Sequence, residues 1–199
     1  MELFKFTDID KVIKDQDKLN ACALVDKSLE DIQMSFIRSK TNDFMLNIFG
    51  QIKPKQTIEF CTAGEFSMHQ LLQYILTFTG PANVYLSTWT LKEEPARVLH
   101  FLKKTGKIKE LNCVFDYRIR TLDEKHFDFL HTIIDKYTLT KCHAKVLAIE
   151  GWYFNVAVIS SANMSNNPRI EAGYISCNDK SVEFHKGWIM DIINGKTVA

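Results

Sequence analysis

From Lys55 onward the chain alternates short β-prone runs with amphipathic segments of helical period, and this alternation limits the possible folds more than any other feature. Strands interleaved with helices of about 10–15 residues indicate an α/β fold with a covered sheet. We therefore predict a mixed β-sheet flanked by helices on both faces. The expected strands are residues 57–62, 84–89, 111–118, 137–140, 145–149, 153–159 and 173–176, and the expected helices are 68–78, 93–104, 123–134 and 181–193.

Residues 1–54 lack this regular alternation. Apolar side chains recur from Leu29 to Ile48, which indicates one or two helices, and Ser28 is a suitable N-cap for the first of them. Gly50 and Pro54 end the section. We predict two parts: an N-terminal helical extension, 1–54, whose role the sequence does not indicate, and a main domain, 55–199.

Composition is that of an ordinary soluble globular protein, with 46% apolar and 25% charged residues. The 25 Lys and Arg residues balance 24 Asp and Glu residues, so any nucleic-acid site must be a local patch. The N-terminus has no apolar signal region, and no apolar run is long enough to cross a bilayer. We expect a cytoplasmic protein without a membrane span.

The five cysteines are odd in number and include no CxxC pair, which argues against a zinc ribbon or a thioredoxin-like site. Cys142 precedes His143, so a metal site or a Cys-His nucleophile stays open as an alternative. A small buried residue on a strand is the favoured interpretation of Cys142. We expect no cofactor and no metal.

Five polar residues after residue 140 form the candidate catalytic set. His143 and Lys145 are two residues apart in a segment that the apolar run 146–149 predicts to be a strand, so their side chains should point the same way. Ser161 and Asn163 follow the next expected strand, and Glu171 begins a third. Each residue alone has an ordinary structural explanation, but together they supply a nucleophile or base, a cation, neutral donors and a carboxylate. Phosphoryl transfer needs such a set.

The pattern HxKx4E, then SSxN, then a downstream Glu resembles the HKD motif of the phospholipase D superfamily, in particular its single-motif endonuclease-like branch. His143, Lys145, Ser161 and Asn163 match the motif, and Glu171 matches a Glu of the single-motif endonucleases. The resemblance covers roughly residues 55–195 and implies a phospholipase D-like phosphodiesterase domain.

Two departures accompany this resemblance. Glu150 stands where the family has Asp, and Ser160 replaces a Gly. Three extra residues also lengthen the spacing before Ser160, which we interpret as a longer β-hairpin through Gly151. These departures affect local geometry more than the expected chemistry.

The resemblance implies a metal-independent, two-step displacement at a phosphodiester. His143 Nε2 attacks phosphorus to form a phosphohistidine, and water then hydrolyses it. Lys145 and Asn163 bind the non-bridging oxygens, Ser161 hydrogen-bonds a phosphate oxygen or a supporting side chain, and Glu171 accepts from His143 Nδ1. The leaving group needs a second histidine. Since the chain carries one such motif, we expect a symmetric homodimer with a shared active site.

A nucleic acid is the expected phosphodiester substrate. Basic residues near the motif suit a polyanion, although Arg118 and Arg120 could equally pair with Asp116 or Asp123; the set is Arg118, Arg120, Lys141, Lys145 and Arg169. The aromatic run 152–154 could stack on bases, but a core or interface position is favoured. The alternatives are a nucleic-acid-binding or structural protein without turnover, and, ranked lower, a lipid-acting enzyme.

Overall fold

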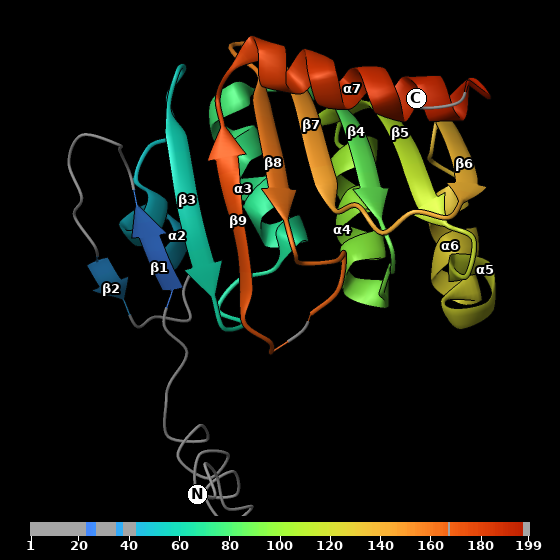
Figure 1. Cartoon of the computed structure of the whole chain (residues 1–199), viewed down its shortest axis with the longest axis horizontal. Coiled ribbons are helices and arrows are strands. Elements are labelled where there is room, and N and C mark those ends of the chain that lie inside the picture. Colours follow the sequence, from blue (N-terminus) through green and yellow to red (C-terminus); the bar gives the residue numbers. More distant parts are fainter. Residues whose placement is uncertain (1–22, 27–34, 38–42, 167, 197–199) are drawn as a thin grey trace, which may run out of the picture.

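The computed structural model describes residues 23–26, 35–37, 43–166 and 168–196. Nine strands form one sheet, and helices cover both of its faces (Figure 1). The strands are β1 (Ala23–Asp26), β2 (Ser35–Ile37), β3 (Thr57–Thr62), β4 (Ala82–Thr88), β5 (Ile108–Asp116), β6 (Lys136–Thr140), β7 (Val146–Gly151), β8 (Val156–Ser160) and β9 (Glu171–Ser176). The helices are α2 (Asp43–Phe49), α3 (Met68–Thr79), α4 (Glu93–Lys104), α5 (Ile119–Leu122), α6 (Glu124–His131) and α7 (Asp179–Ile193).

The sheet is mixed, as predicted. Its strand order is β2-β1-β3-β9-β8-β7-β4-β5-β6. Strands β4, β5 and β6 run parallel to one another, and the other neighbours are antiparallel. The lengthened connection after Glu150 is a hairpin between the antiparallel strands β7 and β8, as its glycine indicated. In the described ranges, no helix is both long and apolar enough to cross a membrane.

Two hydrophobic clusters hold the helices on opposite faces of the sheet. Side chains alternate along a strand, so Leu147 and Ile149 of β7 lie in the larger cluster, whereas Ala148 lies in the smaller one. Helices α3 and α4 contribute to the larger cluster. Helix α7 crosses β4 to β8 on the other face and places Val182 and Ile189 in the smaller cluster (Figure 1). The predicted α/β architecture is confirmed.

The N-terminal section differs from the helices expected there. Ser35–Ile37 is a strand that pairs with β1, and β1 pairs with β3. Among the residues of that section that the structure describes, Asp43–Phe49 is helical, and its Phe44, Ile48 and Phe49 join the larger cluster. The backbone of β1 forms hydrogen bonds with β2 and β3, and the spacing of apolar residues within one segment does not predict such pairing. The expected Ser28 cap lies outside the described residues, and the division at residue 54 stays a prediction.

One edge of the sheet gathers the ends of seven strands, and it is the lower edge in Figure 1. Strands β3, β8, β4, β5 and β6 end there, while β7 and β9 begin there. The register agrees with this arrangement, because Thr62 pairs with Glu171 and Ser87 with Val146. Loops that leave this edge can therefore bring together residues far apart in the sequence.

Candidate active site

His143 and Lys145 lie in the extended segment that leads into β7 at the lower edge. The carbonyl of Lys145 accepts from the N–H of Ser160 at 3.1 Å, so the pairing of β7 with β8 continues to this residue. Lys145 Nζ donates to the carbonyl of His143 at 2.6 Å and lies 3.2 Å from His143 Nδ1. The two side chains thus point the same way, as their spacing predicted.

The two side chains differ sharply in exposure. Lys145 is only 8% exposed, whereas His143 is exposed at the mouth of the site. Burial lowers the pKa of Lys145, while the Cys142 thiol and the Glu171 carboxylate act in the opposite direction. A partly desolvated ammonium interacts more strongly with an anion than a solvated one does.

Ser161, Asn163 and Glu171 reach the same edge from β8 and β9. Ser161 Oγ donates to Glu171 Oε2. Ser161 Oγ also accepts from the N–H of Ala172 at 3.1 Å. Asn163 Oδ1 accepts from the N–H of Trp89 at 3.3 Å, which fixes the loop after β8 against the end of β4. The side-chain amide of Asn163 is therefore anchored through its oxygen.

The expected hydrogen bond between Glu171 and His143 Nδ1 is not formed in the described structure. Lys145 Nζ faces Nδ1 instead, and the carboxylate of Glu171 engages Ser161. The antiparallel pairing of β8 with β9 explains this difference, because it brings the loop residue Ser161 opposite Ala172, the residue after Glu171. An ammonium can only donate, so a charged Lys145 requires Nδ1 to accept and a neutral imidazole to carry its proton on Nε2.

Glu150 lies away from these residues, at the other end of β7. A strand advances about 3.3 Å per residue, which separates Glu150 from Lys145 by roughly 16 Å along the chain. Its carboxylate accepts from Tyr85 Oη at 2.9 Å and from Lys186 Nζ of α7 at 2.6 Å. Glu150 therefore attaches α7 to the sheet, and its difference from Asp leaves the His143 end of the strand unaffected.

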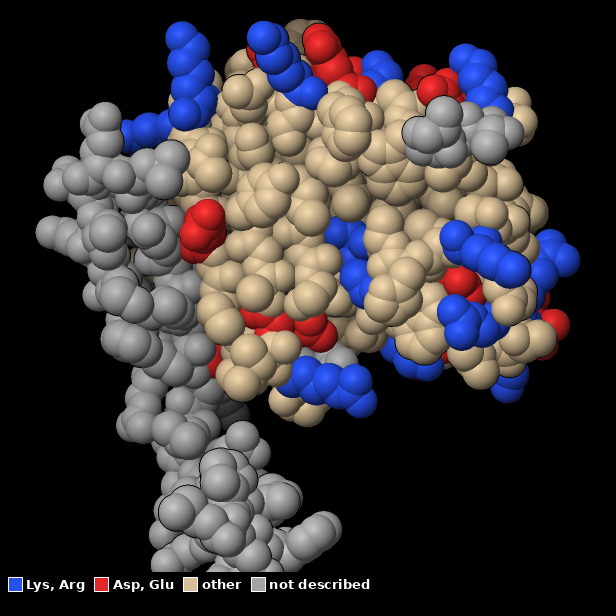
Figure 2. Space-filling model, in the orientation of Figure 1, with Lys and Arg blue, Asp and Glu red and all other residues tan. Residues whose placement is uncertain are grey.

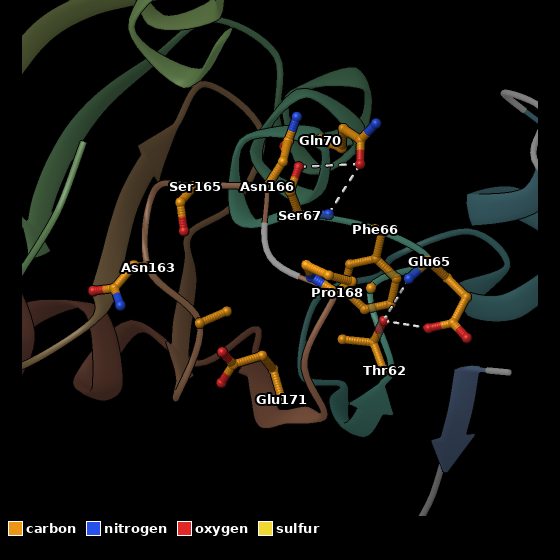
Figure 3. Close-up of a pocket in the computed structure, with 12 residues that line it drawn as sticks. Thr62, Glu65, Phe66, Ser67, Gln70, Asn163, Ser165, Asn166, Pro168 and Glu171 are labelled. Carbon is orange, nitrogen blue, oxygen red and sulfur yellow. Dashed lines mark hydrogen bonds between the residues drawn. The ribbon is translucent and has the colours of Figure 1, made fainter. Parts of the chain in front are cut away.

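A cavity of about 310 Å³ with a mixed polar and apolar lining opens beside Asn163 and Glu171, near the first turn of α3 (Figure 3). The sequence analysis did not predict the side of this cavity that residues 62–70 form. The Ser-x-x-Gln spacing was an available signal, because Ser67 and Gln70 form a capping box, with Ser67 N donating to Gln70 Oε1 at 2.9 Å. The lining residues are Thr62, Gly64, Glu65, Phe66, Ser67, Gln70, Ala162, Asn163, Ser165, Asn166, Pro168 and Glu171.

Trp89 lies beside His143, and Arg118 lies over the Trp89 ring. The Trp89 and His143 ring centroids are 5.9 Å apart. Arg118 donates to Asp116 through Nε at 2.6 Å and Nη2 at 3.2 Å, and Asp116 also accepts from the N–H of Cys142 at 3.2 Å. The hydrogen bond from Arg118 holds the pKa of Asp116 below its ordinary value. Of the two partners considered for Arg118, the structure selects Asp116.

Trp152 and Tyr153 lie in the β7–β8 hairpin, at the edge of the sheet opposite His143. They are 78% and 74% exposed. A stacking role beside the catalytic set is therefore wrong for these two aromatics. Of the favoured core or interface position, their exposure contradicts the core, and the interface stays a prediction. Their neighbour Phe154 does pack against the larger hydrophobic cluster.

The five other histidines all lie on helices, namely His69 on α3, His100 on α4, His126 and His131 on α6, and His185 on α7. His69 is fully buried between Ser67 and Glu94, and burial lowers its pKa. Over the described ranges, no three His, Cys, Asp or Glu residues are grouped so that they could hold a metal ion.

Comparisons with known proteins place the chain far from characterised ones. No protein-family model and no curated protein matches the sequence. Among solved structures, the crystal structure of polyphosphate kinase from Porphyromonas gingivalis shows a partial similarity, with 14% identity and a TM-score of 0.48. The match covers 66% of this chain and 25% of the kinase chain. We therefore infer function from the site itself.

Proposed function

We propose that the protein is a metal-independent phosphodiesterase, most simply a nuclease, in which His143 forms a phosphohistidine intermediate. The observation that carries this proposal is the contact of 3.2 Å between the buried Lys145 ammonium and the exposed His143 imidazole. A cation with little access to water lies directly beside a solvent-facing nucleophile. The resemblance of this segment to the phospholipase D motif supports the same chemistry.

In this proposal Lys145 and Asn163 bind the non-bridging oxygens of the phosphate. Lys145 has one N–H direction left after its contacts with His143, and Asn163 Nδ2 can donate because its oxygen already accepts from Trp89. Donors that are fixed before substrate binds stabilise developing charge without reorganisation. The Ser161–Glu171 pair adds a hydroxyl and a carboxylate beside them.

The two chemical steps set different requirements for His143. In the first, Nε2 forms a bond to phosphorus while the bond to the leaving oxygen breaks, and that oxygen takes a proton from a second imidazole. In the second, water displaces Nε2 and returns the proton. Attack requires the ring proton on Nδ1, so Lys145 must leave Nδ1 when it pairs with the phosphate. The contact with Lys145, in which Nδ1 accepts, belongs to a neutral resting ring and not to the general acid, which carries a proton on both nitrogens.

Cleavage in the presence of EDTA tests the proposed activity. We expect wild-type protein to cleave DNA or RNA oligonucleotides in the presence of about 10 mM EDTA, which exceeds any metal carried over from purification. Cleavage should persist because Lys145 supplies the positive charge at the phosphate. Products separated by denaturing gel electrophoresis provide the readout. Activity that disappears with EDTA and returns with added magnesium would contradict the proposal.

We also propose a homodimer with one shared site, since each step uses a second imidazole. Ile170 lies in the β8–β9 loop at the lower edge and is 72% exposed, so it is available for a contact there. In an isologous contact, identical residues meet at the two-fold axis, which suits a pair of His143 rings. Two adjacent imidazoles also disfavour double protonation, so one stays neutral and one charged.

Subunit mixing gives the dimer a quantitative test. Equal amounts of wild-type and His143→Asn chains, refolded together, should retain about one quarter of the wild-type activity per total chain, because only wild-type pairs contain both imidazoles. Independent monomers would retain about one half. Sedimentation analysis of the same mixture should show dimers, and an activity near one half would contradict a shared site.

One observation favours a second candidate function, nucleic-acid binding without turnover. Glu171 engages Ser161 rather than His143 in the described structure, so the imidazole lacks the carboxylate that usually orients a catalytic histidine. Binding of oligonucleotides without cleavage under any of these conditions would support this candidate over the phosphodiesterase.

A further inference from the structure

Three side chains at the lower edge form a cluster that the proposed chemistry does not use: Trp89, Tyr117 and Arg118. Trp89 follows β4, and Tyr117 and Arg118 follow β5. Strands β4 and β5 are parallel neighbours, so the residues that follow them leave the same edge side by side. We call these three residues the aromatic–arginine cluster.

Arg118 is held rigidly within the cluster. Its guanidinium lies 4.9 Å from the Trp89 ring centroid and 5.6 Å from that of Tyr117. Two hydrogen bonds to Asp116 fix the plane of the guanidinium, while its side chain stays 44% exposed. An arginine ordered before binding loses less conformational entropy when it pairs with a phosphate, and its remaining N–H groups are free to do so.

The cluster is coupled to the candidate active site by three contacts. The Trp89 ring lies 5.9 Å from the His143 ring, and the Trp89 N–H donates to Asn163 Oδ1. Asp116, which orients Arg118, also accepts from the N–H of Cys142, the residue before His143. A group bound on the cluster would therefore be adjacent to a phosphate at His143.

The charge distribution is uneven across the lower edge. On the face seen in Figure 2, acidic and basic side chains lie side by side at the lower edge below β9, whereas Lys and Arg are more frequent than acidic side chains near α5, α6 and β6. Glu65 and Glu171 line the cavity on the β3–β9 side, which is unfavourable for a further phosphate. A polyanion that extends beyond the site should therefore continue toward Arg118.

We propose that the aromatic–arginine cluster binds the nucleotide next to the scissile phosphate of a single-stranded nucleic acid. The base stacks on Tyr117, which is 52% exposed, and contacts the half-buried Trp89 beside it, while Arg118 pairs with the neighbouring phosphate. Bases in a duplex are already stacked on one another, so this contact selects unpaired strands. The inference rests on the proposed function, of which it specifies the substrate class.

Fluorescence anisotropy with a labelled single-stranded oligonucleotide tests this inference, in the His143→Asn background so that cleavage does not interfere. Trp89→Ala and Tyr117→Ala should each weaken binding about tenfold, the typical loss when a stacked base loses its aromatic partner. Trp89→Phe keeps a ring and should restore most of the affinity, which separates stacking from misfolding. A duplex of the same sequence should bind more weakly and lose less affinity with either alanine.

Phe129→Ala is the matched control. Arg97 lies 5.8 Å from the Phe129 ring and pairs with Glu93, so the same side-chain combination occurs on α4 and α6, away from the site. This variant should bind like the parent protein. Unchanged single-strand binding in both cluster variants, or equal losses for duplex and single strand, would overturn the inference. Because the experiment measures binding, its outcome is independent of the cleavage test. Base stacking can be confirmed when metal-independent cleavage is not observed, and cleavage can be observed when stacking is not.

Discussion

Replacing His143 with Asn should lower the rate of phosphodiester cleavage by about 10³-fold or more, because it removes both the nucleophile and its proton-transfer partner in a shared site. The asparagine amide can still hydrogen-bond but cannot form the phosphorus–nitrogen bond. The imidazole is exposed and buries little apolar surface, so folding should be unaffected. Initial rates with excess oligonucleotide, together with a thermal unfolding curve, provide the measurement.

His100→Asn is the matched control for this variant. His100 lies on α4, where its ring packs against Phe129, 4.8 Å between centroids. The same chemical change at that position should leave the cleavage rate within about twofold of wild type, since the site is not touched. Residual activity in His143→Asn comparable to that in His100→Asn would exclude His143 as the nucleophile.

Lys145→Met should lower cleavage by about 10²- to 10³-fold and should stabilise the fold at neutral pH. The activity falls because the ammonium that faces the phosphate is lost. Stability rises because burial makes the pKa of Lys145 lower in the folded than in the unfolded chain. The protonated form therefore costs the folded state free energy wherever both states are charged. Methionine fills a similar volume without that cost.

The sign of this effect gives it a pH dependence. Below the lowered folded pKa of Lys145 the cost is fully present, and it disappears as pH rises toward the unfolded value of about 10.4. The stability advantage of Lys145→Met, measured by urea unfolding, should thus shrink between neutral and alkaline pH. Lys186→Met, which breaks a half-exposed pair with Glu150, should reduce stability slightly and leave activity intact. A Lys145→Met variant that is both active and less stable than wild type would contradict the role of Lys145 as a buried, phosphate-facing cation.

The central and C-terminal elements could be predicted from the sequence because local patterns and tertiary structure agree there. The apolar runs that became β7 and β8 are short and joined by a hairpin after Gly151, and their consecutive buried residues fit strands that are covered on both faces. The two-residue spacing of His143 and Lys145 likewise determined their common direction, since it depends only on strand geometry.

The remaining features depend on contacts between distant segments. The sequence of β2 fits a helical pattern, and only its pairing with β1 makes it a strand. Trp89 joins the site because the loop containing Asn163 docks against the end of β4, a contact across 74 positions of the chain. Trp152 is close to His143 in sequence but far from it in space, because the extended strand β7 lies between them.

The stereochemical course at phosphorus tests the proposed covalent mechanism most directly. An oligonucleotide with one phosphorothioate linkage of defined configuration would be cleaved in ¹⁸O-labelled water, and the configuration of the product determined. Each in-line displacement inverts phosphorus, so attack by His143 followed by attack of water predicts overall retention. Inversion would mean a single displacement by water and would contradict the phosphohistidine mechanism.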